Sequence, residues 1–396
     1  MGSLRLAAVC LTLIPVAAVA QDQQGGPLPP QHAPAAPAVK LSASYSVDAN
    51  AVVAGGAERG LAYLGKIALL IDGDLERLAG LRNSNIHASI IDIHGVGLSG
   101  RYLGNIATVS GIEAEPAIRL NQLWVDTGLG GTARLRVGKF AAAPTFMTSD
   151  TAAFFINSTF GWPAIAASDL PQGGPSCPLS APGVMLTSGR SSGLRVAAAV
   201  FAGTPSGSDA ADPQRSDGHG FKAFRTKGAP LLFGELALDR GPIILKVGGW
   251  RHTGAFARID RPGAASVRGN WSLYAITDLA LNPKASIGKA SVFARVAVAP
   301  GDRNPVPFYV DAGVVVKAPF AGRPYDAVGL GWSLIGLARA PSMRRRPAPE
   351  QVIEFSYSAA FGGHVSIQPN IQFVIDPANG NRRSALVTGL RFTLQR

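Results

Sequence analysis

The stretch that decides the fold is VSIQPNIQFVI, residues 365–375, near the end of the 396-residue chain. Apolar side chains occupy one parity and polar side chains the other: Val365, Ile367, Ile371, Phe373 and Ile375 against Ser366, Gln368, Asn370 and Gln372. The same alternation precedes it in IEFSYSA, residues 353–359. A period of two predicts strands that are apolar on one face and polar on the other, as in a soluble sandwich or a barrel wall.

The overall composition shows that apolar residues are spread along the whole chain. Hydrophobic residues make up 47% and charged residues 16%, and the mean hydropathy is +0.18. After residue 20, no apolar run reaches the roughly 18 residues that a transmembrane helix needs. This composition excludes a coiled coil and an acidic disordered chain. The two cysteines, Cys10 and Cys177, are too few for a disulfide framework or a thiolate zinc site.

The first forty residues predict export. Residues 1–20 carry Arg5, an apolar stretch and the small-residue pattern Ala18-Val19-Ala20, and we expect them to be a signal peptide. Its removal takes away one cation and no acid, so the formal charge falls from +12 to +11. Residues 21–40 are rich in Pro, Gln and Gly and are expected to form a flexible leader, followed by one domain at 41–396.

Gly, Asn, Asp and Pro clusters divide the chain from residue 41 onward into sixteen expected strands. They are residues 41–53, 60–74, 85–97, 117–128, 133–140, 182–189, 193–202, 231–240, 243–253, 270–280, 289–299, 308–317, 326–337, 350–360, 364–375 and 384–395. Connections after even-numbered strands are mostly short, as at 127–132 and 189–192. Several after odd-numbered strands are long, notably 141–181, 203–230 and 338–349.

This sorting of loop lengths decides between the two architectures. An up-and-down barrel in the outer membrane has short periplasmic turns at one end and long extracellular loops at the other. A soluble sandwich has no reason to sort its loops in this way. We therefore expect an all-β, sixteen-stranded antiparallel transmembrane β-barrel, wide enough to keep a water-filled lumen.

Several stretches then resemble one known family, the carbohydrate-selective porins of the OprB type. The resemblance covers most of the chain from residue 41 and rests on these stretches: ERLAGLRNSNIHASIIDIHG (76–95), LRVGKF (135–140) with SDTAAFFINSTFGWP (149–163), WRHTGAF (250–256), SVFARVAVAPGDRN (291–304) with FYVDAG (308–313), and IQPNIQFVIDP (367–377). It implies an outer-membrane diffusion channel of a Gram-negative bacterium that carries sugars, acts as a monomer and uses no covalent chemistry or cofactor.

The sequence departs from the family pattern in three ways. The chain ends in Phe392-Thr393-Leu394-Gln395-Arg396 rather than on the aromatic residue used in barrel assembly. Gln122 and Asp126 stand where the family often has glutamate, and Arg251 stands where an aromatic residue is expected. These departures predict a lumen that is more cationic than in the relatives.

Strand parity assigns the side chains that line the lumen. Leu135 and Val137 are expected to face lipid, which turns Arg134 and Arg136 inward, and the same rule is applied to the other strands. The expected lining consists of Trp124, Asp126, Arg134, Arg136, Arg195, Glu235, Lys246, Trp250, His252, Phe293, Arg295, Asp311, Lys317, Glu354 and Arg391. Cations, carboxylates and aromatic rings together suit a sugar, which donates and accepts hydrogen bonds and stacks on rings.

The long segment 141–181 is the expected constriction, because so many residues on an exposed loop would be unusual. Within it, Asp150, Asn157, Ser158 and Trp162 are candidate sugar contacts. Phe154, Phe155 and Trp162 have a second interpretation, in which they only hold the loop against the wall.

Other chemistries find little support. The six histidines show no metal-binding spacing, and Cys177 has no base nearby in the sequence, so neither a metal site nor a nucleophile is expected. The cations are scattered, which argues against nucleic acid, and the loop tip Arg344-Arg345-Arg346 is a candidate contact for lipopolysaccharide phosphates.

Two functions remain open. The first is passive diffusion of mono- or oligosaccharides, with outer-membrane lipids and the barrel-assembly machinery as further partners. The alternative is a general or anion-preferring porin for small solutes, which would follow from the formal charge of +11 after signal-peptide removal.

Overall fold

The computed structural model describes residues 37–208, 211–226, 228–343, 345–377 and 383–396. Sixteen strands form within these residues. They are β1 (Val39–Gly56), β2 (Gly60–Asp74), β3 (Ser84–Gly95), β4 (Ala117–Gly130), β5 (Ala133–Phe140), β6 (Ala181–Gly189), β7 (Gly193–Phe201), β8 (Leu231–Asp239), β9 (Ile243–Phe256), β10 (Val267–Ala280), β11 (Lys289–Val298), β12 (Phe308–Lys317), β13 (Ala327–Gly336), β14 (Glu350–Phe361), β15 (Val365–Ile375) and β16 (Arg383–Gln395).

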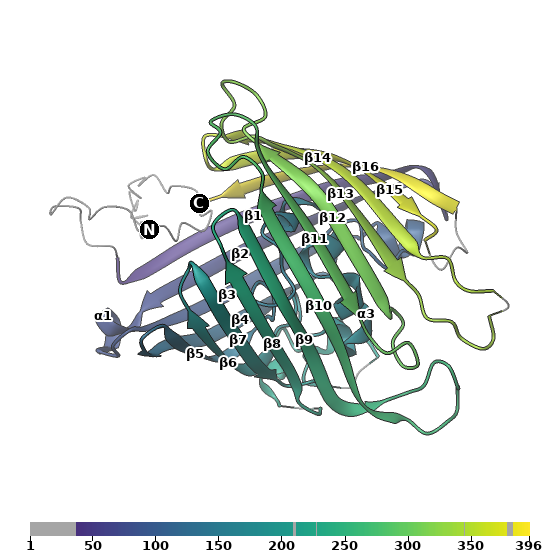
Figure 1. Cartoon of the computed structure of the whole chain (residues 1–396), viewed down its shortest axis with the longest axis horizontal. Helices are drawn as coiled ribbons and strands as arrows, with labels where there is room; N and C mark the ends of the chain where they lie inside the picture. Colours follow the sequence, from purple (N-terminus) through teal and green to yellow (C-terminus); the bar gives the residue numbers. More distant parts are fainter. Residues whose placement is uncertain (1–36, 209–210, 227, 344, 378–382) are drawn as a thin grey trace, which may run out of the picture.

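The strands close into one antiparallel barrel, as expected (Figure 1). Each strand pairs with its neighbours in the chain, and β1 pairs with β16, with Ser44 opposite Gln395 and Val52 opposite Val387. Because the wall is closed, no strand edge is left with unpaired backbone groups, which is the condition for crossing a bilayer with strands.

The strand ends differ from expectation by a few residues. β1 begins at Val39, so the last two residues of the expected leader already belong to the barrel wall. β10 begins at Val267 rather than at residue 270, because Gly269, with φ +87°, shifts the pairing register between Arg268 and Asn270 and lets the strand continue. The expected signal peptide lies outside the described residues.

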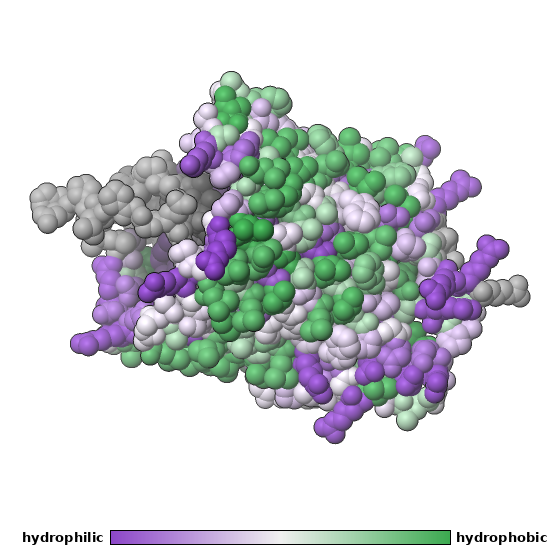
Figure 2. Space-filling model, viewed as in Figure 1, coloured by the Kyte–Doolittle hydropathy of each residue, from purple (hydrophilic) through white to green (hydrophobic). Residues whose placement is uncertain are grey.

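Side-chain alternation gives the barrel two different faces. Along β15, Ile371 and Phe373 are exposed on the outside while Gln372 and Val374 are buried inside. Figure 2 shows the result on one side of the molecule, where apolar side chains cover the middle of the strands and hydrophilic ones gather at both ends. An apolar belt between two polar rims is the surface that a bilayer solvates.

The connections are sorted as expected. Short turns and the helix α1 (Leu75–Ala79) lie at the end of the barrel where β1 starts, and the long loops lie at the other end (Figure 1). The loop between β5 and β6 carries α2 (Ser158–Gly161) and α3 (Ala164–Asp169), and the loop between β7 and β8 carries α4 (Pro213–Ser216). No helix in the described part of the chain is long and apolar enough to cross a membrane.

The core sits inside the barrel, where the β5–β6 loop meets the wall. Its largest buried cluster joins loop residues such as Phe146 and Ile165 to inward side chains of the strands, such as Phe201, Trp250 and Tyr309. The lumen is thus partly filled from one side by a packed loop.

Candidate functional site

The candidate site is the part of the lumen into which residues 141–180 fold. These residues are called the constriction loop. This loop leaves β5, folds into the barrel and returns to β6, which confirms the expectation that it lies inside the wall. It packs against the inner faces of β8 to β15, which we call the docked wall. The inner faces of β2 to β5, on the other side of the lumen, are called the open wall.

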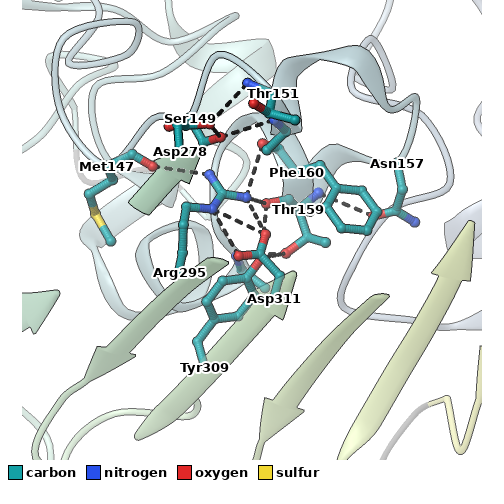
Figure 3. A network of polar contacts seen from close by, with 12 residues as sticks. Met147, Ser149, Thr151, Asn157, Thr159, Phe160, Asp278, Arg295, Tyr309 and Asp311 are labelled. Carbon is teal, nitrogen blue, oxygen red and sulfur yellow. Dashed lines mark hydrogen bonds and ion pairs between the residues drawn. The ribbon is translucent and has the colours of Figure 1, made fainter. Parts of the chain in front are cut away.

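Arg295 of β11 is the centre of the contact between loop and wall (Figure 3). Its guanidinium donates to the backbone carbonyls of Met147 at 3.1 Å and of Thr159 and Phe160 at 3.0 Å each. The same group forms an ion pair with Asp311, whose carboxylate also accepts from the Tyr309 hydroxyl at 2.8 Å. One buried cation therefore ties two parts of the loop to two strands.

Carboxylates of the docked wall accept hydrogen bonds from backbone N–H groups of the loop. Glu354 accepts from the N–H groups of Ile156 and Asn157, both at 2.8 Å. Glu235 accepts from Met147 at 3.2 Å, and Asp278 accepts from the Thr151 N–H at 3.2 Å. A buried N–H group left without an acceptor costs about 1–3 kcal/mol, so these carboxylates determine where the loop can lie.

Aromatic rings and glycines complete the docking. Phe155 and Phe160 of the loop contact Phe293 of β11, with ring centroids 6.0 and 6.2 Å apart. Opposite them, a Cβ atom on Gly331 of β13 would lie only 2.9 Å from the Phe160 ring, and one on Gly329 only 2.7 Å from Phe154. The missing side chains leave the space that the rings occupy, which supports the interpretation of these rings as anchors.

Six expected lining residues are therefore placed differently from the expectation. Five of them are wall side chains that point inward, as parity predicts, but are buried under the loop instead of being exposed to the lumen: Glu235, Trp250, Arg295, Asp311 and Glu354. The sixth is the expected sugar contact Asn157, which is buried within the loop itself. Phe293 and His252 are also buried, and the His252 ring contacts the Gly203 carbonyl at 3.4 Å. For the buried charges the physical cause is that a loop folded into the lumen needs polar partners on the wall.

The open wall keeps two arginines partly in contact with water. Asp126 of β4 pairs with both Arg134 and Arg136 of β5, and the arginine side chains remain 33% and 23% exposed. Asp126 itself is buried beneath them, which corrects the expectation that it is exposed to the lumen. Trp124 lies between His87, whose ring centroid is 4.9 Å away, and Arg136, whose Cζ atom is 3.8 Å from the indole centroid. Since His87 and Arg136 approach from the strands on either side, the indole faces are occupied and its stacking surface is not free for a sugar.

The remaining expected residues are spread around the lumen. Asp150 is exposed, and Ser158, Trp162 and Arg195 are half-buried. The Lys246 ammonium donates to the Thr148 carbonyl at 2.8 Å. Arg391 of β16 makes two hydrogen bonds of 2.7 Å to Asp48 of β1.

Sequence reasoning missed several inward residues. Asp278 follows the alternation that found Asp311, so the same rule would have identified it. Arg119 had no such signal, because a bulge at Asn121 shifts the register of β4 against β3 and turns Arg119 inward. Arg119 is buried in an ion pair with Asp217 of the β7–β8 loop, with 2.8 Å between Nε and Oδ2. A second loop, residues 96–116, also folds inward, and Glu350 accepts from its Ile106 and Ala107 N–H groups.

Two acidic groups in the loops have shifted pKa values. Burial raises the pKa of Asp169 in α3 from 3.8 to about 8, although the Val306 N–H donates to its Oδ1 and acts in the opposite direction. The other oxygen, Oδ2, is buried and has no hydrogen-bond partner among the described residues. Burial also raises the pKa of Glu113 in the second loop, although hydrogen bonds from Ser99 act to lower it. Burial thus favours the protonated, neutral form of Asp169 in the constriction loop.

Histidines and acids do not gather into a metal site. Among the described residues, no group of three or more His, Cys, Asp or Glu side chains is placed to hold an ion. His87 and His94 lie in one strand, but His87 faces the lumen beside Asp72 and His94 faces outward beside Tyr63.

Comparisons with known proteins agree with this geometry. The chain is 30% identical over 121 residues to Porin B of Pseudomonas aeruginosa, a match that covers 26% of this chain and 27% of that protein. It superposes on the high-pH structure of Pseudomonas putida OprB with a TM-score of 0.78 and 18% identity, covering 91% of this chain and 94% of the other. A more distant fold match is DcaP of Acinetobacter baumannii, with a TM-score of 0.55, 10% identity and coverages of 90% and 97%.

A family model extends the match to nearly the whole barrel. The model described as "Carbohydrate-selective porin, OprB family" matches residues 58–395. The barrel is accordingly one that spans the outer membrane of a Gram-negative bacterium. The resemblance carried by the sequence motifs is confirmed, and this chain belongs to the OprB family of carbohydrate-selective porins.

Proposed function

We propose that this protein is a channel for passive diffusion of mono- or oligosaccharides across the outer membrane into the periplasm. The docked loop is the observation that carries the proposal. The loop is held by the charges of the docked wall, and it leaves Arg134 and Arg136 of the open wall, paired with Asp126, partly in contact with water. Such a surface can hydrogen-bond the hydroxyl groups of neutral polar solutes.

On this proposal the open wall is where a sugar exchanges water for protein contacts. Arg134 and Arg136 donate to hydroxyl oxygens and Asp126 accepts from hydroxyl groups, while Arg195 and Arg391 extend the donor surface. Binding stays weak, because conduction requires that the sugar leave as readily as it enters. The family is one of channels rather than enzymes, and we propose that no covalent step takes part.

Liposome swelling tests the proposal. Proteoliposomes containing the purified barrel are placed in isosmotic D-glucose, D-mannitol or glycine, and the initial swelling rates are compared. We expect glucose to enter faster than its size relative to the other solutes predicts. Rates ordered by size alone would contradict carbohydrate selectivity and indicate a general sieve.

The second candidate is an anion-preferring porin. The formal charge of the chain is +12. Arg134 and Arg136 carry two positive charges but share one carboxylate, that of Asp126. Single-channel recordings in a salt gradient separate the two candidates. A strong anion preference without any block by sugar would favour the second.

We further propose that the channel works as a single barrel, which size-exclusion chromatography with light scattering in detergent would test. Arg345 and Arg346, which are exposed in the β13–β14 loop, are proposed to contact lipopolysaccharide phosphates, whereas Arg344 lies outside the described residues. Insertion by the barrel-assembly machinery and the absence of nucleic-acid partners remain predictions.

A further inference from the structure

A cavity of about 210 Å³ opens inside the barrel beneath the start of the constriction loop. Residues Asp150, Thr151 and Phe154 of the loop form its roof. Gly241 and Pro242, in the short turn between β8 and β9, lie at its rim. The cavity is therefore at the short-turn end of the lumen, which in an outer-membrane barrel faces the periplasm.

Two charged groups of opposite sign in this cavity have no side-chain partner in the part of the chain that the structure describes. Asp150 in the loop and Lys317 at the end of β12 are both exposed. Neither side chain makes a hydrogen bond or an ion pair with another described residue, although other loop and wall charges nearby are paired. Asp278 adds an acceptor, because Thr151 and Ser149 occupy only its Oδ1 atom. Ser291 adds a hydroxyl group.

The remaining lining is apolar. The Phe154 ring, half-buried in the roof, and the side chains of Ile244 and Val315 line the same cavity. A carboxylate, an ammonium group and a hydroxyl thus stand beside an aromatic ring and branched aliphatic groups. This combination suits a pyranose, which has hydroxyl groups at its edge and C–H groups on its faces.

The size of the cavity limits what it can hold. Its volume equals that of about seven water molecules at liquid density, which accommodates one sugar ring. A disaccharide would have to extend from it into the lumen.

We propose that this cavity is a second sugar subsite, specific for a single pyranose ring, from which the solute is released into the periplasm. The inference rests on the proposed sugar transport and deepens it, because it separates an exit subsite from the open wall. Asp150 accepts hydrogen bonds from the sugar, Lys317 donates to it, and Phe154 contacts a ring face.

The test measures block of single-channel current by D-glucose added separately to each side of a planar bilayer, with the wild type and two variants, Asp150→Asn and Lys317→Gln. Both side chains are exposed, so neither change disturbs the barrel wall. We expect each variant to weaken block from the short-turn side at least fivefold while block from the other side stays within twofold. Lys284→Gln, in the β10–β11 turn and outside the cavity, removes the same charge and should change neither.

Two further arms sharpen the result. Ser291→Phe fills the cavity and should remove the same component of block without removing a charge. D-Mannitol, an open-chain polyol, should block weakly from the short-turn side, because it has no ring face. Unchanged glucose block from that side in Asp150→Asn, Lys317→Gln and Ser291→Phe overturns the subsite and leaves the transport proposal intact. A wild type that glucose blocks from neither side overturns both.

Discussion

The docked wall and the open wall use the same kinds of side chain for different purposes. On the docked wall Arg295 and Asp311 are 3% and 0% exposed and bind the constriction loop. On the open wall Arg134 and Asp126 form the same type of pair, but the arginine remains 33% exposed. An inward-pointing charge is therefore not necessarily a solute contact, because the position of the loop determines which charges remain solvated.

The energetic consequences of the two environments differ. A charge buried under the loop loses its hydration and needs its partner, so removal of one partner leaves an uncompensated buried ion. A half-exposed charge is solvated by water when its partner is lost, and exposed pairs contribute only about 0–1 kcal/mol. Substitutions on the docked wall should change the shape of the pore, and those on the open wall should change its selectivity.

The largest effect is expected for Arg295→Ala. It leaves Asp311 buried without its cation and removes the bonds to three loop carbonyls, which should weaken docking of the loop by about 3–5 kcal/mol. The loop should then leave the wall, and single-channel conductance should rise severalfold with loss of discrimination between sugars. Arg190→Ala, at an exposed turn position, serves as the control. Wild-type conductance in Arg295→Ala would show that the loop is held by other contacts.

A smaller effect is expected for Gly331→Ala. The new Cβ atom would lie 2.9 Å from the Phe160 ring and 3.0 Å from the Phe155 ring, and such overpacking costs about 1–3 kcal/mol. We expect frequent current fluctuations as the loop moves on and off the wall. Gly234→Ala in β8 is the matched control, since its Cβ would meet nothing within 4 Å. If the current fluctuates equally little in both variants, the space at Gly331 is not needed to dock the loop.

A still smaller effect is expected for the pH dependence of loop docking, which should arise from the ionisation of Asp169. Its pKa is about 8 when the loop is docked and near 3.8 when it is not, so the docked state binds the proton more tightly. The stabilising effect is complete below pH 3.8 and is lost as the pH rises through about 8. Current fluctuations should therefore increase from pH 4 to pH 8. Asp169→Asn, which cannot ionise, should remove this slope, and an unchanged slope would assign it to another group.

The smallest change in stability is expected for Arg136→Gln on the open wall. Asp126 keeps Arg134 as its partner, so the free energy of unfolding should change by less than about 1 kcal/mol. The ion selectivity should shift toward cations, which the reversal potential in a potassium chloride gradient measures. Arg240→Gln, exposed in the β8–β9 turn, should not shift it. A loss of stability as large as that of Arg295→Ala would remove the distinction between the two walls.

Local patterns in the sequence were sufficient to predict the barrel wall. Alternation in residues such as Ile371 to Val374 and the sorting of loop lengths led to sixteen strands in the observed order. Both signals are local, because each residue faces lipid or lumen according to its own parity. The position of Asp278 was available from the same rule.

Contacts between distant residues decided the site. Glu354 accepts a hydrogen bond from Ile156, which is 198 positions away in the sequence. Arg119 faces inward because of a bulge that the neighbouring residues do not predict. Parity by itself determined that Arg134 and Arg295 point toward the lumen. Only the tertiary structure decided that one stays in water and the other is buried, because burial depends on where a loop of forty residues, 141–180, finds its hydrogen-bond partners.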